Sequence, residues 1–234
     1  MMIRGWRQWF GLGASEMLPS REAYALWADT YPPHPHNPLM AAEQAVVAPI
    51  IEAVAPRRAL DVGTGTGRNL TLLSSAGARF VVGVDLSLPM LEHRRCRTPR
   101  VCGDACRLPF ADRSFDLVCA SLMVGDVADL RPWIAEASRV LIPGGHLVYS
   151  DFHPAWSAEQ WRRTFRAADG RRFELSYVPH TIDEHLQHLE DADLEVRVIR
   201  EPRIASRTTP VVAVFHAVKP APATMRQRVA TRDC

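Results

Sequence analysis

The chain has 234 residues, of which 47% are hydrophobic and 23% are charged, and its formal net charge is +2. These values are typical of a globular protein with one sizeable core, and they lack the basic excess of a nucleic-acid-binding protein. Five cysteines without CxxC spacing favour neither a disulfide framework nor a metal site, so we expect a cytoplasmic protein with no bound metal.

The first part of the chain, residues 1–55, is expected to form a helical lid. Residues 1–19 are basic and aromatic but lack the apolar run of a secretory signal, and no window of the chain is apolar enough to span a membrane. We interpret this leader as a short amphipathic helix that packs on the domain or on a partner subunit. A second helix is predicted over 39–55, broken or kinked at Pro49.

Between these segments the sequence predicts a helix over 20–31. Ser20 is a suitable N-cap residue, and Tyr24, Trp27 and Tyr31 recur on one helical face. This aromatic stripe either covers a ligand or forms part of the core.

From residue 58 onward, short apolar segments alternate with helical segments. Such alternation predicts a parallel sheet with helices on both faces. The last two strands are separated by too few residues for a helical crossover, so we expect them to pair antiparallel. The strands are expected at 58–62, 79–85, 100–104, 114–121, 146–152, 194–201 and 210–218, and the helices at 66–76, 86–96, 129–141 and 181–191.

One segment of the predicted domain, residues 56–218, and the tail that follows the domain lack such regularity. Residues 153–180 are aromatic and charged without a clear period, and we expect them to form a cap insertion. Aromatic walls favour an apolar or ring-containing ligand, although the same residues would also bury an irregular cap. Residues 219–234 are rich in Ala, Pro and Arg and are expected to be disordered.

The segment DVGTGTGR, residues 61–68, lies between a predicted strand and a predicted helix. Gly63, Gly65 and Gly67 permit backbone angles and close ligand approach that a Cβ atom would block. Asp85, at the end of the next strand, is placed to accept hydrogen bonds from both hydroxyls of a ribose. A glycine loop followed by this acid predicts a nucleoside site at the carboxyl edge of the sheet.

The glycine spacing does not by itself decide which nucleoside is bound. The dinucleotide fingerprint GxGxxG is absent. If Gly63 is the first glycine of the motif, its sixth position is occupied by Arg68 instead of glycine. Asp61 precedes the first glycine by two residues, where its carboxylate either orders the loop and faces the ammonium group of a ligand or interacts with the helix dipole.

Residues 20–152 resemble the class I S-adenosylmethionine-dependent methyltransferases, especially the ubiquinone/menaquinone and biotin-pathway branch. The resemblance lies in DVGTGTG, VGVDLS, GDACRLPFADRSFDLV and RVLIPGGHLVYSD, in that order. It implies a Rossmann-like, doubly wound α/β sheet of seven strands, mostly parallel, with an antiparallel last strand. It also implies S-adenosyl-L-methionine as the cofactor.

The resemblance further implies a role for individual residues at the cofactor. The glycine loop would lie along its methionine and ribose, Asp85 would hold the ribose, and Leu86 would pack on adenine. Met90 is a less secure adenine neighbour, since a buried methionine on a helix is usually core. The implied cofactor-binding residues are Tyr24, Tyr31, Asp61, Gly63, Thr64, Gly65, Gly67, Asp85, Leu86, Met90, Asp104, Ala105 and Ser121, with residues 121–123 near the sulfonium.

Catalysis of methyl transfer depends mainly on positioning, and a base is needed only if the acceptor must lose a proton. His153 is the first candidate base because it follows the fifth strand, and His180 is the second. Each is also compatible with a loop histidine that is bonded to the backbone.

We therefore expect an enzyme that moves a methyl group to an oxygen, nitrogen or carbon atom of a small, possibly aromatic, biosynthetic molecule. The chain is expected to act as a monomer or homodimer, without nucleic acid or membrane. The alternatives are a nicotinamide-dependent oxidoreductase and a cofactor-retaining, non-methylating cyclase or binding protein.

Overall fold

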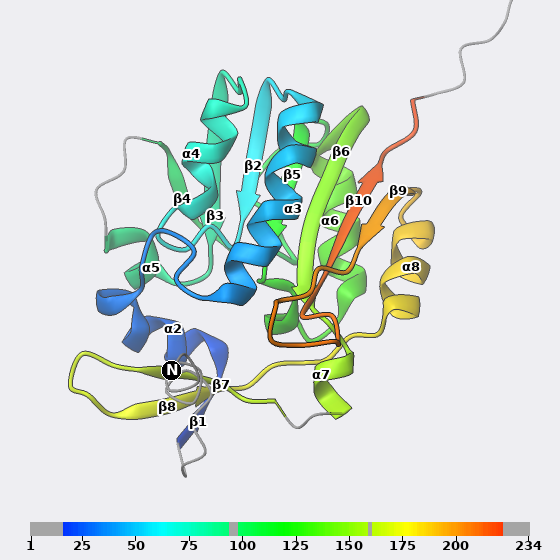
Figure 1. The fold of residues 1–234 in the computed structure, drawn as a ribbon. Coiled ribbons are helices and arrows are strands. Elements are labelled where there is room, and N and C mark those ends of the chain that lie inside the picture. Colours follow the sequence, from blue (N-terminus) through cyan, green and yellow to red (C-terminus); the bar gives the residue numbers. More distant parts are fainter. Residues whose placement is uncertain (1–15, 94–97, 159–160, 222–234) are drawn as a thin grey trace, which may run out of the picture.

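Two sheets organise the computed structural model, which describes residues 16–93, 98–158 and 161–221 (Figure 1). The larger sheet has seven strands, and all are parallel except β10, which runs antiparallel to both of its neighbours. The predicted Rossmann-like sheet with an antiparallel last strand is confirmed. In spatial order the strands are β4 (Arg100–Cys102), β3 (Phe80–Asp85), β2 (Arg58–Val62), β5 (Phe115–Ser121), β6 (Leu141–Phe152), β10 (Val212–Val218) and β9 (Glu195–Arg200).

Helices cover both faces of this sheet, as the alternating pattern predicts. On one face lie α3 (Pro38–Val54) and α4 (Arg68–Ser75), and on the other lie α6 (Leu130–Val140) and α8 (Ile182–Asp191). The central strands are apolar on both sides for this reason. The short helix α5 (Leu88–Glu92) follows β3.

Local capping explains where two of these helices begin. The side chain of Asn37 accepts a hydrogen bond from the Met40 N–H at the start of α3, and Pro38 occupies the first turn, where no amide hydrogen is required. Pro49 lies inside α3 and does not end it, so of the two expectations the break is wrong and the kink stays a prediction. At α8, Thr181 and Glu184 form a capping box at the start of the helix.

The smaller sheet joins the N-terminal segment to the cap. Its strands are β1 (Glu16–Leu18), β8 (Arg172–Leu175) and β7 (Arg163–Arg166), with β1 parallel to β8 and β7 antiparallel to it. The cap therefore contains a regular hairpin, preceded by the short helix α7 (Ala155–Ala158).

The N-terminal leader is consequently not a helix where it is described, since residues 16–18 form a strand. Three residues show no period, and their partner strand lies about 150 positions further along the chain, so local pattern could not identify them. The rest of the leader and the predicted disordered tail, apart from residues 219–221, lie outside the described residues.

The helix α2 (Ser20–Trp27) lies between the two sheets, beyond the carboxyl ends of the parallel strands (Figure 1). A 3-10 turn, η1 (Ala28–Thr30), follows it. Pro19, not Ser20, holds the N-cap position, so the predicted cap is wrong. The Ser20 hydroxyl instead donates to Asp126, on the turn η2 (Val124–Asp126).

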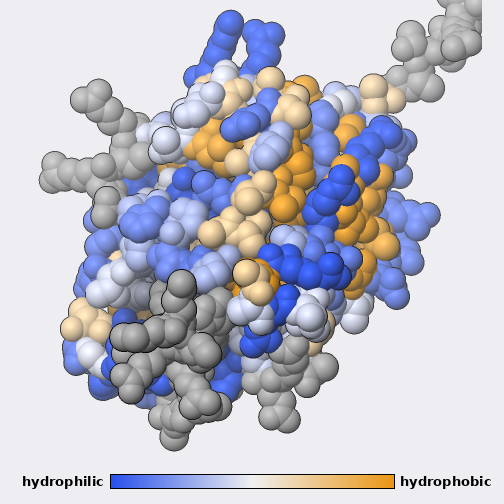
Figure 2. Space-filling view, in the orientation of Figure 1, coloured by the Kyte–Doolittle hydropathy of each residue, from blue (hydrophilic) through white to orange (hydrophobic). Residues whose placement is uncertain are grey.

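A shallow apolar groove lies on the surface of the sheet face that carries α3. Apolar side chains show on the outside between α3 and the β9–β10 edge (Figure 2), where a shallow groove includes Val46, Ile50 and Val198. α3 borders this groove on one side, and β9 and β10 border it on the other. Among the described residues, no helix has the length and apolarity needed to cross a membrane.

Candidate functional site

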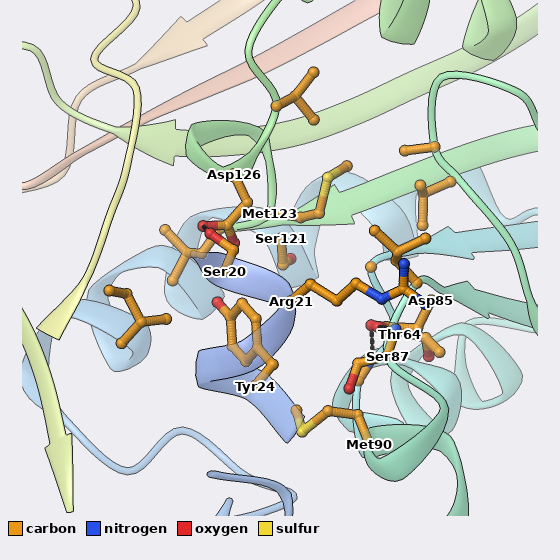
Figure 3. A pocket seen from close by; sticks show the side chains of 18 of the residues that line it. Ser20, Arg21, Tyr24, Thr64, Asp85, Ser87, Met90, Ser121, Met123 and Asp126 are labelled. Carbon is orange, nitrogen blue, oxygen red and sulfur yellow. Dashed lines mark hydrogen bonds between the residues drawn. The ribbon is translucent and has the colours of Figure 1, made fainter. Parts of the chain in front are cut away.

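A cavity of about 690 Å³ lies at the carboxyl edge of the larger sheet. The loops that follow β2, β3 and β5 form its floor, and α2 with the smaller sheet forms its roof. Figure 3 shows side chains from both sides pointing into it, with Asp85 and Thr64 at one end and Asp126 and Ser20 at the other. Ligands of open α/β sheets bind at this edge.

The glycine loop forms the floor because its backbone approaches other elements closely. Gly63, Gly65 and Gly67 have φ angles of +68°, +53° and +96°. A Cβ atom on Gly63 would lie 2.4 Å from Cγ of Met123, and one on Gly65 would lie 3.1 Å from Cε of Met90. Gly63 and Gly65 line the cavity, whereas Gly67 occupies the N-cap position of α4 and does not line it.

Asp85 ends β3 and its carboxylate lines the cavity. Oδ2 accepts a hydrogen bond of 2.7 Å from the Gly65 N–H, and Oδ1 accepts one of 2.8 Å from the Ser87 N–H. Burial raises the pKa of Asp85, while these two amides act to lower it. Each oxygen keeps a second lone pair for a ligand hydroxyl.

Asp61 lies behind the loop rather than in the cavity. Its side chain is buried, and Oδ1 accepts hydrogen bonds from Nδ2 of Asn69 at 3.2 Å and from Sγ of Cys119 at 3.3 Å. Burial raises the pKa of Asp61, against the hydrogen bonds that its neighbours donate. These two contacts tie Asp61 to α4 and β5, and its side chain does not line the cavity.

The residues around Asp85 fit an adenosine group. The hydroxyls of Thr66 and Ser87 line the cavity and are buried without a hydrogen-bond partner in the described part of the chain. Buried polar atoms without partners are rare in native proteins, so these two are suited to a polar ligand. Leu86, Met90 and Ala105 add apolar surface for a flat ring.

The remaining predicted cofactor residues also lie at this cavity. Thr64 packs on Gly83, and Asp104 accepts a hydrogen bond from the Cys106 N–H with Oδ1. The structure thus brings together eleven of the thirteen residues and leaves out two. Those that line the cavity are Tyr24, Tyr31, Gly63, Thr64, Gly65, Asp85, Leu86, Met90, Asp104, Ala105 and Ser121, and those that do not are Asp61 and Gly67.

The predicted aromatic stripe lines the cavity, with Tyr24 and Trp27 on α2 and Tyr31 directly after η1, because the helix ends before the predicted residue 31. Tyr24 and Trp27 stack with ring centroids 6.2 Å apart, and Tyr31 meets Trp27 edge to face at 4.8 Å. Burial raises the pKa of both Tyr24 and Tyr31, so their hydroxyls stay protonated. Trp27 also stacks on Phe165 of the smaller sheet, which joins the lid to the cap.

A charged cluster, defined as Ser20, Tyr24, Asp126 and Arg163, lies at the other end of the cavity. Nη1 of Arg163 donates to Oδ1 of Asp126 at 2.6 Å, and Nη2 donates to the Tyr24 hydroxyl at 2.6 Å. Sequence reasoning identified only Tyr24 of this set. Asp126 lies five residues beyond β5 and Arg163 lies in the cap, and only the fold brings them together.

The two predicted catalytic histidines are not brought to the cavity. Nε2 of His153 lies 2.7 Å from Oε1 of Glu201, and Nδ1 accepts from the Ala155 N–H. His180 is buried, with Nε2 2.9 Å from the carbonyl oxygen of Val127. Both fit the alternative of a loop histidine held by its neighbours. No group of three His, Cys, Asp or Glu is arranged to hold a metal ion in the described ranges.

A buried ion pair supports the cavity wall behind the glycine loop. Nη1 of Arg68 lies 2.9 Å from Oε2 of Glu43, whose Oε1 accepts from the Ser150 hydroxyl at 2.9 Å. Burial lowers the pKa of Arg68, but Glu43, Tyr31 and Asp61 together outweigh burial, so the pKa is raised overall. The pair links α3, α4 and β6 beneath the site.

The strand order, the glycine loop and the strand-end carboxylate define the class of this molecule. It is an α/β protein with a doubly wound sheet that holds a nucleoside-bearing cofactor at the carboxyl edge. Comparisons with known proteins narrow the class to a family.

Residues 60–149 match a family model described as a methyltransferase domain. The demethylmenaquinone methyltransferase of Corynebacterium kroppenstedtii is 32% identical over 176 residues, which cover 70% of this chain and 76% of that protein. The enzyme of that name from Renibacterium salmoninarum is 41% identical over 115 residues, covering 47% of this chain and 48% of the relative. The alignment thus spans about half the length of several curated relatives.

Solved structures share the fold. An S-adenosylmethionine-dependent methyltransferase from Clostridium acetobutylicum superimposes with a TM-score of 0.63 at 15% identity, over 77% of this chain and 92% of that one. The cyclase SpnF superimposes with a TM-score of 0.60 at 19% identity, over 89% of this chain and all of that one. At these identities the likeness shows the fold alone.

The chain belongs to the class I S-adenosylmethionine-dependent methyltransferases, in the branch that includes the demethylmenaquinone methyltransferases. The cofactor of this family is S-adenosylmethionine, and the cavity end around Asp85 fits its adenosine. The nicotinamide cofactor that the sequence left open is thereby set aside.

Proposed function

We propose that this protein transfers a methyl group from S-adenosylmethionine to a small, ring-containing acceptor of the quinol type. When bound, the cofactor supplies an electrophilic methyl group on a sulfonium. Asp85 holds the ribose hydroxyls, Leu86 and Met90 pack on the adenine, and Gly63 and Gly65 lie along the rest of the cofactor.

One observation carries this proposal: the cofactor end and the aromatic end belong to one cavity and meet at residues 121–123. Ser121 and Met123 lie between Asp85 and Asp126 in Figure 3. A methyl donor at one end and an acceptor at the other would therefore face each other directly. Such positioning supplies much of the acceleration in a displacement, up to roughly 7–11 kcal/mol.

The acceptor end favours a flat ring with a polar substituent. Phe152 and Trp161 line it and contact each other with centroids 4.8 Å apart. The charged cluster lies beside them, so one edge of a bound ring would meet polar groups. The relatives named demethylmenaquinone methyltransferase support a quinol-type ring for this chain.

The first test is calorimetric titration of the protein with S-adenosylhomocysteine. We expect saturable binding at one site, and NADH is expected to give no heat. The second test offers methyl-labelled S-adenosylmethionine with 1,4-naphthohydroquinone and, as matched acceptors, a phenol, a carboxylic acid and an aliphatic amine. We expect label in the quinol product.

The results separate the possible functions. Tight binding of NADH without a response to S-adenosylhomocysteine would contradict the proposed cofactor site. Cofactor binding with no labelled product from any acceptor would contradict methyl transfer and favour a non-methylating protein such as a cyclase. Label in the amine alone would contradict the proposed acceptor class.

A further inference from the structure

Asp126 is the acidic side chain at the acceptor end of the cavity. It ends the turn η2, after β5, and only 12% of its side chain is exposed. In Figure 3 its carboxylate lies beside the Ser20 hydroxyl and above the Tyr24 ring, on the opposite side of the cavity from Asp85. It therefore faces the space proposed for the acceptor rather than for the adenosine.

The two carboxylate oxygens of Asp126 have different surroundings. Oδ1 accepts hydrogen bonds from the Ser20 hydroxyl at 2.7 Å and from Nη1 of Arg163 at 2.6 Å. Oδ2 has a longer contact of 3.4 Å with Nη2 of Arg163, and the Tyr24 hydroxyl also hydrogen-bonds to this carboxylate. A carboxylate oxygen has two lone pairs, so Oδ2 has capacity for a ligand hydroxyl.

Arg163 fixes this carboxylate in place. Its guanidinium is buried, with its central carbon 4.9 Å from the centroid of the Phe152 ring. Burial lowers the pKa of Arg163, but Asp126 and Tyr24 outweigh this and raise it, so the group stays charged. The ionised carboxylate compensates the charge of the buried arginine, so the pair holds its geometry before the proton is transferred.

Five other titratable groups that line the cavity are less suited to accept a proton from the acceptor. Tyr24 and Tyr31 have raised pKa values and remain protonated. Asp85 lies at the adenosine end, and Asp129 caps α6 by accepting from the Arg131 N–H. His36 packs against Trp27 and Tyr31.

We propose that Asp126 is the general base of the reaction, with Ser20 and Arg163 as its positioning residues; this rests on the proposed methyl transfer. The acceptor hydroxyl donates to Oδ2 and loses its proton to that oxygen. The electron pair of the O–H bond stays on the acceptor oxygen, and that oxygen, or the ring carbon conjugated with it, forms the new bond to the methyl carbon. If carbon is the nucleophile, it afterwards gives up its hydrogen as a proton while the ring oxygen takes one up, so the product is again a quinol. The carbon–sulfur bond breaks, its pair stays on sulfur, and the positive charge of the sulfonium and the negative charge of Asp126 are both neutralised.

The test compares Asp126→Asn with the wild type in labelled methyl transfer to 1,4-naphthohydroquinone. General-base catalysis contributes about 10²- to 10⁴-fold, so we expect kcat to fall by at least about 100-fold. The affinity for S-adenosylhomocysteine, measured by calorimetry, is expected to stay within about 2-fold, since Asp126 lies at the other end of the cavity. Asp183→Asn, on the exposed start of α8, is the matched control and is expected to retain wild-type kcat.

The pH profile distinguishes a base from a structural residue. Above about pH 9 a phenolic hydroxyl begins to ionise without help, so the Asp126→Asn rate is expected to rise toward that of the wild type. This variant leaves every group that interacts with Asp126 unchanged. Ser20 of α2 and Arg163 of β7 donate hydrogen bonds to its carboxylate, and Tyr24 of α2, Tyr31 and Asp85 of β3 interact with it electrostatically. A deficit that stays constant with pH, or a kcat within about 3-fold of the wild type, would overturn the proposal.

Ser20→Ala supplies an independent test because it leaves the buried ion pair intact. We expect kcat to fall roughly 3- to 10-fold, the effect of losing one neutral hydrogen bond, and the deficit to shrink as the acceptor ionises. An unchanged kcat would overturn the role of Ser20, and a pH-independent deficit would overturn base catalysis. If the wild type itself labels no acceptor, the proposed function fails. If the wild type and Asp126→Asn are both active, only the role of Asp126 as the base fails.

Discussion

The carboxylate of Asp85 accepts a hydrogen bond of 2.7 Å from the backbone N–H of Gly65. This bond ties the end of β3 to the loop that follows β2, so two neighbouring strands jointly form the floor of the cavity. A charge-assisted bond of this kind is shorter and stronger than a neutral one. The same carboxylate therefore serves both the shape of the loop and the proposed grip on the ribose.

Replacing Asp85 with alanine is expected to weaken the binding of S-adenosylhomocysteine roughly 10- to 100-fold, because hydrogen bonds to a charged group contribute about 1.5–3 kcal/mol. Calorimetric titration measures this loss. Asp183→Ala, which removes an exposed carboxylate of α8, is the matched control and is expected to bind normally. Unchanged affinity in Asp85→Ala would contradict the proposed cofactor site.

Gly63→Ala is expected to destabilise the fold more than Gly77→Ala. Both glycines have positive φ angles, +68° and +101°, so each alanine carries a backbone cost of about 1–2 kcal/mol. Only at Gly63 would the Cβ atom overlap another group, 2.4 Å from Cγ of Met123, whereas Gly77 has nothing within 4 Å. Overpacking adds about 1–3 kcal/mol, which urea unfolding can resolve. Equal losses in the two variants would show that Met123 moves aside without cost.

The larger sheet and the cofactor end were predictable from the sequence because their signals are local. Apolar strands that alternate with helices indicate a parallel sheet, and parallel strands bring their carboxyl ends to one edge. Asp85 follows its strand directly, so its place at that edge needs no knowledge of distant contacts. Gly63 and Gly65 are likewise marked by a spacing within one short loop.

The acceptor end was not predictable because it depends on contacts between distant segments. Arg163 meets Asp126 across 37 positions and Tyr24 across 139. The sheet that carries Arg163 includes β1, whose three residues have no period of their own.

His153 illustrates the same difficulty at a strand end. Its backbone N–H donates to the Val211 carbonyl, which turns the chain toward the segment before β10 and places the ring beside Glu201. A position after a strand therefore predicts the edge of the sheet but not the direction of the side chain.

Glu43→Gln is expected to cost about 3 kcal/mol of stability, because it leaves the charge of Arg68 buried without its partner. The carboxylate of Glu43 is 1% exposed and the side chain of Arg68 10%. The control is Glu195→Gln, which removes a partner of Arg197 in a pair whose side chains are both 54% exposed, and a loss below about 1 kcal/mol is expected. Urea unfolding of the two variants gives the comparison. A loss at Glu43 no larger than that at Glu195 would mean that water or another group compensates Arg68.

His216 is expected to make the fold sensitive to acid. Nδ1 of His146 lies 2.9 Å from Nε2 of His216 beside the groove between α3 and β9–β10, and burial lowers the pKa of His216 from 6.5 to about 4, with smaller contributions from His146 and Arg197. As the pH falls from about 6.5 to about 4, the unfolded chain binds a proton at this ring that the folded protein does not, so stability present above that window is lost within it.

Because the ring is only half-buried, we expect His216→Gln to remove about 1 kcal/mol of this pH dependence. Urea unfolding at a series of pH values measures it, and His34→Gln, at an exposed position, should leave the wild-type slope. If the free energies of unfolding of His216→Gln and the wild type fall in parallel from neutral to acid pH, protonation of His216 does not cause the loss of stability and another group governs the acid response.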